Sequence, residues 1–470
     1  MDWTDAFDAY VTDQRDRDGV PAVAVGLARG GTPVYFKGFG YAREPGSPPP
    51  TAETVFGIGS ITKSFTAVAI LQLQERGVLS VHDPVTRFLP EFRLPRQRDA
   101  SGVTLHHFLT HTSGLPPLPF LFGTLKRSMA DDPSVRDDAD MWKLVEATEA
   151  IDTYEDLMEA IAGHDIDLTG APGAAFSYSN DAYALLGAIV ERASGMPYAT
   201  FVRENILEPA GMRASQFEPV FAPEVDVASL YSRRDEEGQS VVVAAPVWWH
   251  APAHLGAGFL KSTVSDMLRY AEIYRSAGVV SGERLLSPDS VRQMTMPYME
   301  AAPGRWYGYG LFVTPRFHGG TLIEHGGSVK GVQAQLCIVP ERGLTSVVLT
   351  NVQGAPAEQI AIGVMQAAMG TELGEEVWTY ESQLDNVRPA EVFVGRYVSG
   401  EGATLEFVQE DGSLVLRLAG ESYPMERLRD DLFLVRMKDV RRPLRFWFDE
   451  GGLPHAISFA LRMIPKEAVP

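Results

Sequence analysis

The chain is poor in cysteine: its 470 residues include one, Cys337, within the apolar run Leu336–Val339. A single cysteine excludes an intramolecular disulfide, so nothing in the sequence indicates an oxidising compartment. The N-terminus, Met1–Asp5, has neither a basic start nor an apolar segment, so we expect no signal peptide. Nor does the chain contain a continuous apolar run long enough to cross a bilayer. These absences predict a cytoplasmic protein without a membrane partner.

Positive charge is also scarce. Lys and Arg together number 41 against 61 Asp and Glu, which gives a formal net charge of -20. Binding to nucleic acid or to an anionic membrane needs a concentrated basic surface, so this balance argues against both partners. The hydrophobic share of 45% is ordinary for a globular protein, and the length favours one large domain with a smaller one.

The stretch that organises the chain is Phe56–Ile70, where a glycine-punctuated loop runs into a segment of helical character. Ser60 and Lys63 stand three positions apart, which puts two side chains on one face of a helix. A serine is a weak nucleophile until a base takes its proton, and a lysine becomes such a base when burial lowers its pKa from about 10.4. Because the following turns are almost wholly apolar, we expect Lys63 to be buried. Both residues are candidates for catalysis, although an N-capping serine followed by a surface lysine gives the same pattern.

Two later stretches strengthen this interpretation. One is the triplet Tyr178–Asn180 and the other is the triplet His325–Gly327. Ser-x-x-Lys followed by a Ser-Asp-Asn triplet and a Lys-Thr-Gly triplet is the pattern of β-lactamases and penicillin-binding proteins, and the same order is kept here. The sequence therefore resembles the serine β-lactamase and penicillin-binding protein-like family. The resemblance is to the branch that holds class C β-lactamases, D-alanyl-D-alanine carboxypeptidases, D-aminopeptidases and β-lactamase-like esterases.

Three further stretches extend the resemblance, so that it runs from about Val20 to Asn351; they are Leu109–Leu115, Gly256–Thr263 and Tyr307–Gly310. It implies an α+β fold in which an antiparallel sheet is flanked by helices, beside an all-helical subdomain. The hydrophobic patterns agree with this, because a hairpin precedes many helices and apolar strands and a closing helix follow them. His325 is expected at or just before the first of two adjacent antiparallel strands between residues 325 and 351.

The resemblance also implies roles for individual residues. Ser60 would attack an ester or amide carbonyl and become acylated, while Lys63 and Tyr178 share the proton transfers. Which of the two is the base stays open, because strongly coupled groups titrate as a pair. The backbone N–H groups of Ser60 and Ser328 would form the oxyanion hole, and Asn180 would orient the substrate and Lys63.

The third triplet departs from the β-lactamase pattern. Where those enzymes carry a lysine that meets the substrate carboxylate, this chain has His325, which is mostly neutral at pH 7. Gly326 also removes the threonine hydroxyl. We keep His325, Gly326 and Gly327 as candidate substrate-binding residues, but efficient β-lactam hydrolysis is not expected.

The leading hypothesis is thus a serine hydrolase that forms an acyl-enzyme on Ser60 and acts on small esters or on amides and peptides with D-residues. An acyltransferase would use the same residues. A binding or assembly protein on a degenerate hydrolase fold is the alternative without catalysis. We expect no cofactor, and a homo-oligomer is compatible with the sequence.

The hydropathy pattern divides the chain. Residues 1–375 form the predicted hydrolase domain, and residues 389–470 show short alternating strands typical of a small β-barrel-like domain. Residues 118–169 form a long connection between two motif-bearing stretches, which suggests a cap over the pocket or a surface insertion without a role.

Histidines cluster at His106, His107 and His111. The last two have the spacing of a zinc site, but no glutamate follows His107 as the His-Glu-x-x-His pattern requires. We therefore predict no metal site.

Overall fold

The computed structural model describes residues 3–236, 239–437 and 440–467. The central layer is an antiparallel sheet made of β1 (Ala22–Arg29), β2 (Thr32–Gly40), β9 (Met299–Ala302), β10 (Arg305–Tyr307), β11 (Phe312–Phe317), β12 (Gly320–Val329), β13 (Val332–Val339) and β14 (Leu344–Thr350). The strand order is β2-β1-β14-β13-β12-β11-β10-β9, so the N-terminal hairpin pairs with the last strand of this sheet. The expected hairpin, sheet and closing helix are confirmed.

Helices cover both faces of this sheet. On one face, α1 (Trp3–Arg17) and α13 (Ala357–Met369) pack against each other and against the strands. On the other face, α11 (Val264–Arg275) lies across β1, β13 and β14. Because both faces are covered, β1 and β14 are buried along nearly their whole length and show no alternation of buried and exposed residues.

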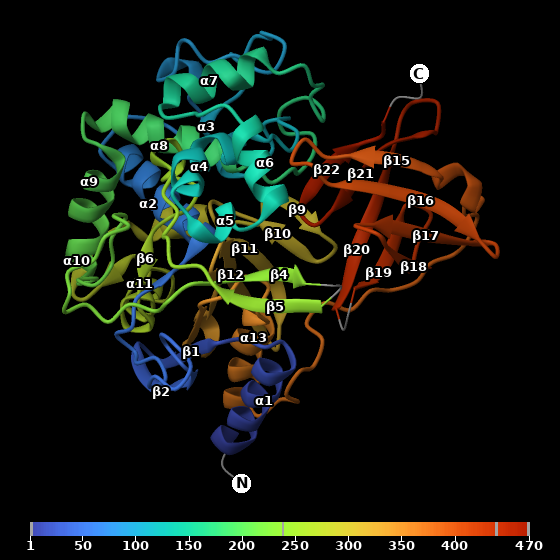
Figure 1. Cartoon of the computed structure of the whole chain (residues 1–470). Coiled ribbons are helices and arrows are strands. Elements are labelled where there is room, and N and C mark those ends of the chain that lie inside the picture. The colour runs from blue at the N-terminus through green and yellow to red at the C-terminus, as the bar shows by residue number, and fades with distance from the viewer. Residues whose placement is uncertain (1–2, 237–238, 438–439, 468–470) are drawn as a thin grey trace.

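The all-helical part lies beyond α11, at the upper left of Figure 1. Its central pair is α2 (Thr62–Glu75), buried from Thr62 to Leu73, and α8 (Asn180–Ser194). Ser179 caps the start of α8, and Gly195, in the left-handed region, ends it. The remaining helices of this part are α3 (Leu105–Leu109), α4 (Phe120–Ala130), α5 (Pro133–Arg136), α6 (Ala139–Ala147), α7 (Tyr154–Gly163), α9 (Tyr198–Val202), α10 (Glu208–Ala210) and, beside the first sheet, α12 (Pro288–Met294).

The C-terminal part is a second antiparallel sheet, with its strands in sequence order, at the right of Figure 1. It consists of β15 (Gly395–Val398), β16 (Thr404–Glu410), β17 (Ser413–Leu418), β18 (Glu421–Arg427), β19 (Leu432–Met437), β20 (Val440–Phe448), β21 (Pro454–Phe459) and β22 (Arg462–Pro465). The Glu467 N–H donates to the Arg396 carbonyl over 2.8 Å, which brings the last strand to the first and nearly closes a barrel. Aromatic side chains such as Phe393, Phe407 and Phe446 fill its interior. The predicted α+β fold with a C-terminal barrel-like sheet is confirmed.

One strand differs from the sequence-based expectation. His325 does not stand at the edge of a strand but in the middle of β12, opposite Leu336 of β13. The region 325–351 is therefore part of three strands rather than two. Gly326 and Gly327 weaken strand propensity, so the sequence pattern did not show that β12 is continuous through them. None of the helices in the described part of the chain has the length and apolar character needed to span a bilayer.

Two short hairpins complete the strands: β4 (Tyr231–Glu236) with β5 (Gln239–Ala244), and β7 (Val279–Val280) with β8 (Glu283–Arg284). The connection 118–169 folds into the helices α4 to α7. A buried ion pair anchors it: Lys330 Nζ, next to the end of β12, lies 2.7 Å from Asp132 Oδ2. Trp249 Nε1 donates to the same carboxylate oxygen over 2.9 Å. The connection is thus tied to the strand that carries the third motif.

We expect Lys330→Met to lower the free energy of unfolding by about 3–5 kcal/mol, because the Asp132 carboxylate would remain buried without its cation. The matched control is Lys143→Met, which removes an exposed lysine paired with Asp140 in the same connection. That variant should change stability by less than about 0.5 kcal/mol. Urea unfolding of both variants gives the comparison, and equal stabilities would contradict the anchoring role.

Candidate active site

Ser60 lies on a 3-10 turn, Gly59–Ile61, between the short strand β3 (Phe56–Gly57) and α2. β3 is held by β6 (Lys261–Ser262). Ser60 is partly exposed, whereas both of its neighbours are buried. Gly59 has φ +50°, and a Cβ there would come within 2.6 Å of the Ser328 nitrogen. A glycine therefore lets the turn that carries Ser60 lie against β12.

Lys63 is fully buried, and its amine contacts three oxygen atoms. Nζ lies 3.1 Å from Ser60 Oγ, 2.9 Å from Asn180 Oδ1 and 2.7 Å from the Ala257 carbonyl oxygen. The amide and carbonyl oxygens can only accept, so the amine donates to them. A neutral amine then has its lone pair left for the Ser60 hydroxyl proton.

Electrostatics favour that neutral amine. Burial lowers the Lys63 pKa well below its usual range, and the positive charge of Arg462 lowers it further. The carboxylates of Asp181 and Glu401 oppose this shift with smaller effects. The buried lysine that the sequence predicted is therefore present beside Ser60.

Tyr178 completes the group at Ser60. Its ring centroid lies 4.8 Å from Lys63 Nζ. Burial raises the pKa of the Tyr178 phenol, while its hydrogen-bonding neighbour Ser60 and the charge of Arg462 act in the opposite direction. The phenol thus stays protonated at neutral pH, whereas burial shifts the Lys63 amine toward its neutral form.

His111 was not singled out as a site residue from the sequence, yet it holds the segment that carries Tyr178. Its Nδ1 accepts a hydrogen bond from the Ser179 N–H over 3.1 Å, and its carbonyl accepts one from the Ser177 N–H over 2.9 Å. The imidazole lies 4.2 Å from the Tyr178 ring, centroid to centroid. His111 has φ +57°, a conformation that the sequence does not reveal. Burial, followed by the nearby Lys63, lowers its pKa well below the usual value.

His325 lies behind Tyr178 and is 2% exposed. Nδ1 is 2.6 Å from the Gly326 carbonyl and therefore donates to it, so Nε2 accepts from the Tyr307 hydroxyl over 3.1 Å. Burial is the largest of the effects that lower its pKa to about 3, followed by the charge of Lys63. The imidazole is thus neutral, and its ring packs among the aromatic residues around Tyr178.

The glycines after His325 allow β12 to approach Ser60. A Cβ on Gly327 would lie 1.8 Å from the Ile58 carbonyl oxygen and 3.1 Å from the Ser60 nitrogen. A Cβ on Gly326 would lie 2.8 Å from Gln335 Oε1. The structure therefore brings Ser60, Lys63, Tyr178 and Asn180 together, with the backbone from Gly327 to Ser328 beside them.

Gly327→Ala should lower the free energy of unfolding by about 1–3 kcal/mol and reduce any Ser60-dependent activity, because the turn at Ile58 must move away from β12. Gly102→Ala is the matched control, since a Cβ there has no neighbour within 4 Å. Thermal unfolding and initial rates measure both effects. Wild-type stability in the Gly327 variant would contradict the close packing.

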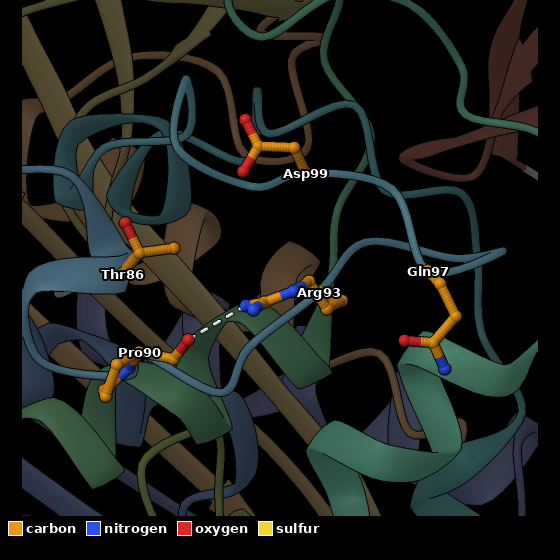
Figure 2. Close-up of a pocket in the computed structure, with 5 residues that line it drawn as sticks. All are labelled: Thr86, Pro90, Arg93, Gln97 and Asp99. Atoms are coloured by element: carbon orange, nitrogen blue, oxygen red, sulfur yellow. Dashed lines mark hydrogen bonds between the residues drawn. The ribbon is translucent and has the colours of Figure 1, made fainter.

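Several cavities lie outside this group. Figure 2 shows an open one of about 340 Å³, lined by Thr86, Pro90, Arg93, Gln97 and Asp99, in which Arg93 donates to the Pro90 carbonyl. None of these residues belongs to the three motifs. A second cavity, of about 300 Å³, lies between the two sheets and borders Phe176 and Leu461.

Among the described residues, no three His, Cys, Asp or Glu side chains are grouped as metal ligands. The predicted histidine cluster is engaged otherwise: His106 Nδ1 lies 2.8 Å from the Tyr309 hydroxyl, and the His107 imidazole closes a capping box with Thr104. Each histidine thus has a structural contact of its own.

Comparisons with known proteins identify the family of the chain. The sequence model of the Beta-lactamase family matches residues 7–368. Penicillin-binding protein 4 of Amycolatopsis lactamdurans is 28% identical over 405 residues, which cover 83% of this chain and 92% of that protein. Esterase EstB of Burkholderia gladioli is 40% identical over 205 residues, 43% of this chain and 48% of that protein.

Solved structures extend the likeness to the whole chain. The octameric penicillin-binding protein homologue from Pyrococcus abyssi has a TM-score of 0.66 and 28% identity, and the match covers 99% of this chain and all of that one. A D-stereospecific amidohydrolase from Streptomyces sp. shares the fold, with a TM-score of 0.61, 23% identity and coverage of 78% of this chain and 99% of that one. This chain belongs to the beta-lactamase family, a family of serine hydrolases.

Proposed function

We propose that this chain is a serine hydrolase that forms an acyl-enzyme on Ser60. The observation that carries the proposal is the contact of a fully buried Lys63 amine with the Ser60 hydroxyl, at 3.1 Å. A partly exposed serine beside a buried amine has both an activated nucleophile and access for a substrate.

In this proposal Lys63 is the base that takes the Ser60 proton. The directions of the two pKa shifts favour this assignment, since burial lowers the pKa of the Lys63 amine and raises that of the Tyr178 phenol. Tyr178 would then give its proton to the leaving group and take up in its place the proton that Lys63 received from Ser60, while Asn180 would hold the Lys63 amine. The same pair would activate the water that releases the acyl group.

We propose the backbone N–H groups of Ser60 and Ser328 as the oxyanion hole. Gly59 and Gly327 support this, because both permit β12 to lie directly against the Ser60 turn. For His325, Gly326 and Gly327 we keep a substrate-binding role as a proposal. The buried, neutral His325 would shape the wall of the site and would not supply a positive charge for a substrate carboxylate.

As substrates we propose small esters, or amides and peptides with D-residues. The neutral His325 supports substrates that need no cation at this position, and an esterase and a D-stereospecific amidohydrolase occur among the similar proteins. Acyl transfer to another acceptor would use the same residues. We also retain residues 1–375 and 389–470 as proposed domains and residues 118–169 as a proposed cap.

The test is a screen of p-nitrophenyl esters of increasing chain length beside D- and L-aminoacyl p-nitroanilides. We expect a burst of chromophore equal to the enzyme concentration with at least one short ester or D-aminoacyl substrate. Deleting residues 120–165 should change the range of accepted chain lengths if this segment is a cap. A complete absence of turnover across the screen would contradict the hydrolase and favour the binding protein.

A further inference from the structure

The last hairpin of the C-terminal sheet reaches the Ser60 site. β21 and β22 are joined through Ala460 and Leu461, which have φ values of +47° and +68°. The Leu461 carbonyl accepts a hydrogen bond from the Tyr178 N–H over 2.9 Å, and the Met463 N–H donates to Ser177 Oγ over 3.4 Å. The hairpin is therefore attached to Tyr178, the first residue of the second motif, and to the side chain of Ser177 just before it.

Arg462 lies between these two attachments. Its guanidinium carbon is 4.8 Å from the centroid of the Tyr178 ring. Two hydrogen bonds of 2.9 Å each hold the guanidinium on the Glu401 carboxylate, and the Arg462 side chain is 17% exposed. A bidentate pair fixes the plane of a guanidinium, so Arg462 has a defined position against the ring.

We propose that Arg462 is a positioning residue of the Ser60 site. Its guanidinium holds the Tyr178 ring and places a permanent positive charge beside the Lys63 amine, so the C-terminal sheet completes the catalytic centre. The inference rests on the proposed function, because it assigns a role within the same reaction.

The charge of Arg462 shifts the pKa values of Lys63 and Tyr178 in the same direction. It lowers the pKa of Lys63 and that of Tyr178, while Glu401 raises both with a smaller effect. A guanidinium stays charged at every pH at which the protein is folded, so this influence does not titrate. The other ionisable groups that face Lys63 and Tyr178 are His111, Asp181, Tyr183, Tyr307 and His325.

Four of those groups, two histidines and two tyrosines, add no charge near neutral pH. His111 and His325 have lowered pKa values because they are buried, so their imidazoles are neutral there. The tyrosines are protonated, since burial raises their pKa values. Removing Arg462 would thus leave Lys63 facing the carboxylates of Asp181 and Glu401, which stabilise its protonated form.

The test is the pH profile of kcat/KM for a p-nitrophenyl ester in Arg462→Met, Arg462→Lys and Glu401→Gln. In Arg462→Met we expect the acid limb of the profile to move to higher pH by about one unit. The value of kcat/KM would then fall roughly tenfold at pH values below the limb and change little above it. Arg462→Lys should leave the limb near its wild-type position, and Glu401→Gln should move it to lower pH. Arg417→Met, in an exposed pair with Glu410 on the same sheet, is the matched control and should leave the profile unchanged.

If Arg462 had a purely structural role, Arg462→Met would lower kcat/KM by the same factor at every pH and leave the acid limb in place. That outcome would overturn the proposal. If Arg462→Met does not fold, Glu401→Gln decides, and an unmoved limb in that variant counts against the proposal. The Ser60→Ala variant distinguishes a failure of the proposed function from a failure of this inference. Hydrolysis that does not depend on Ser60 would refute the proposed function, whereas Ser60-dependent hydrolysis with an unmoved limb in Arg462→Met refutes this inference alone.

Discussion

Replacing Ser60 with alanine should abolish both the burst and the steady-state hydrolysis of an activated ester, with a loss in kcat of about 10³-fold or more. The physical reason is that no other hydroxyl takes its place: the Lys63 amine would face a methyl group and the acyl-enzyme could not form. The fold should be preserved, because the change removes one partly exposed hydroxyl. Stopped-flow absorbance with p-nitrophenyl acetate measures burst and rate together.

Ser101→Ala is the control for this experiment, since Ser101 is an exposed serine whose hydroxyl bonds to Asp99 away from the motifs. Its rates should equal those of the wild type. Residual turnover in Ser60→Ala at more than about a tenth of the wild-type rate would contradict the assignment of the nucleophile.

The second large effect is expected for Lys63→Met, with a loss in kcat of about 10²–10⁴-fold. A protonated amine cannot accept the Ser60 proton, so wild-type kcat/KM should fall as the pH falls through the lowered pKa of Lys63. The acid limb of the wild type should therefore lie well below pH 10.4, the usual lysine value. In Lys63→Met this limb should disappear.

The chain offers a matched control in a second buried lysine, Lys261. Its Nζ donates to the Phe217 carbonyl over 2.6 Å, and burial lowers its pKa to about 7. Lys261→Met should affect stability but leave the acid limb in place, because the amine contacts no motif residue. If the acid limb moved in Lys261→Met and stayed in place in Lys63→Met, the assignment of the limb to Lys63 would be wrong.

Local patterns in the sequence predicted much of this site. The spacing of Ser60 and Lys63 predicted two side chains on one helical face, and the structure places Ser60 on the 3-10 turn before α2 and Lys63 on the first turn of α2. The apolar run after them predicted the burial of Lys63. The Tyr178–Asn180 triplet stands at the start of α8, a buried helix that Ser179 caps. Short-range signals sufficed because each of these features depends on neighbours within a few turns.

Other features depend on contacts between distant residues, and no local pattern carries them. Arg462 meets Tyr178 across 284 positions of sequence, through a hairpin that by itself reads as an ordinary strand pair. The buried pair of Asp132 and Lys330 is similar, since each residue alone is typical of a surface. The positive φ of His111 was not predicted either, because only a few per cent of non-glycine residues adopt this conformation and no local pattern marks them.

The central claim is a covalent acyl group on Ser60, and intact-protein mass spectrometry tests it most directly. The protein is mixed with a slowly hydrolysed activated ester, quenched in acid and digested for peptide mapping. We predict one acyl group per chain, located on Ser60 and absent from Ser60→Ala. An unmodified protein during confirmed turnover, or an acyl group on another residue, would contradict the account.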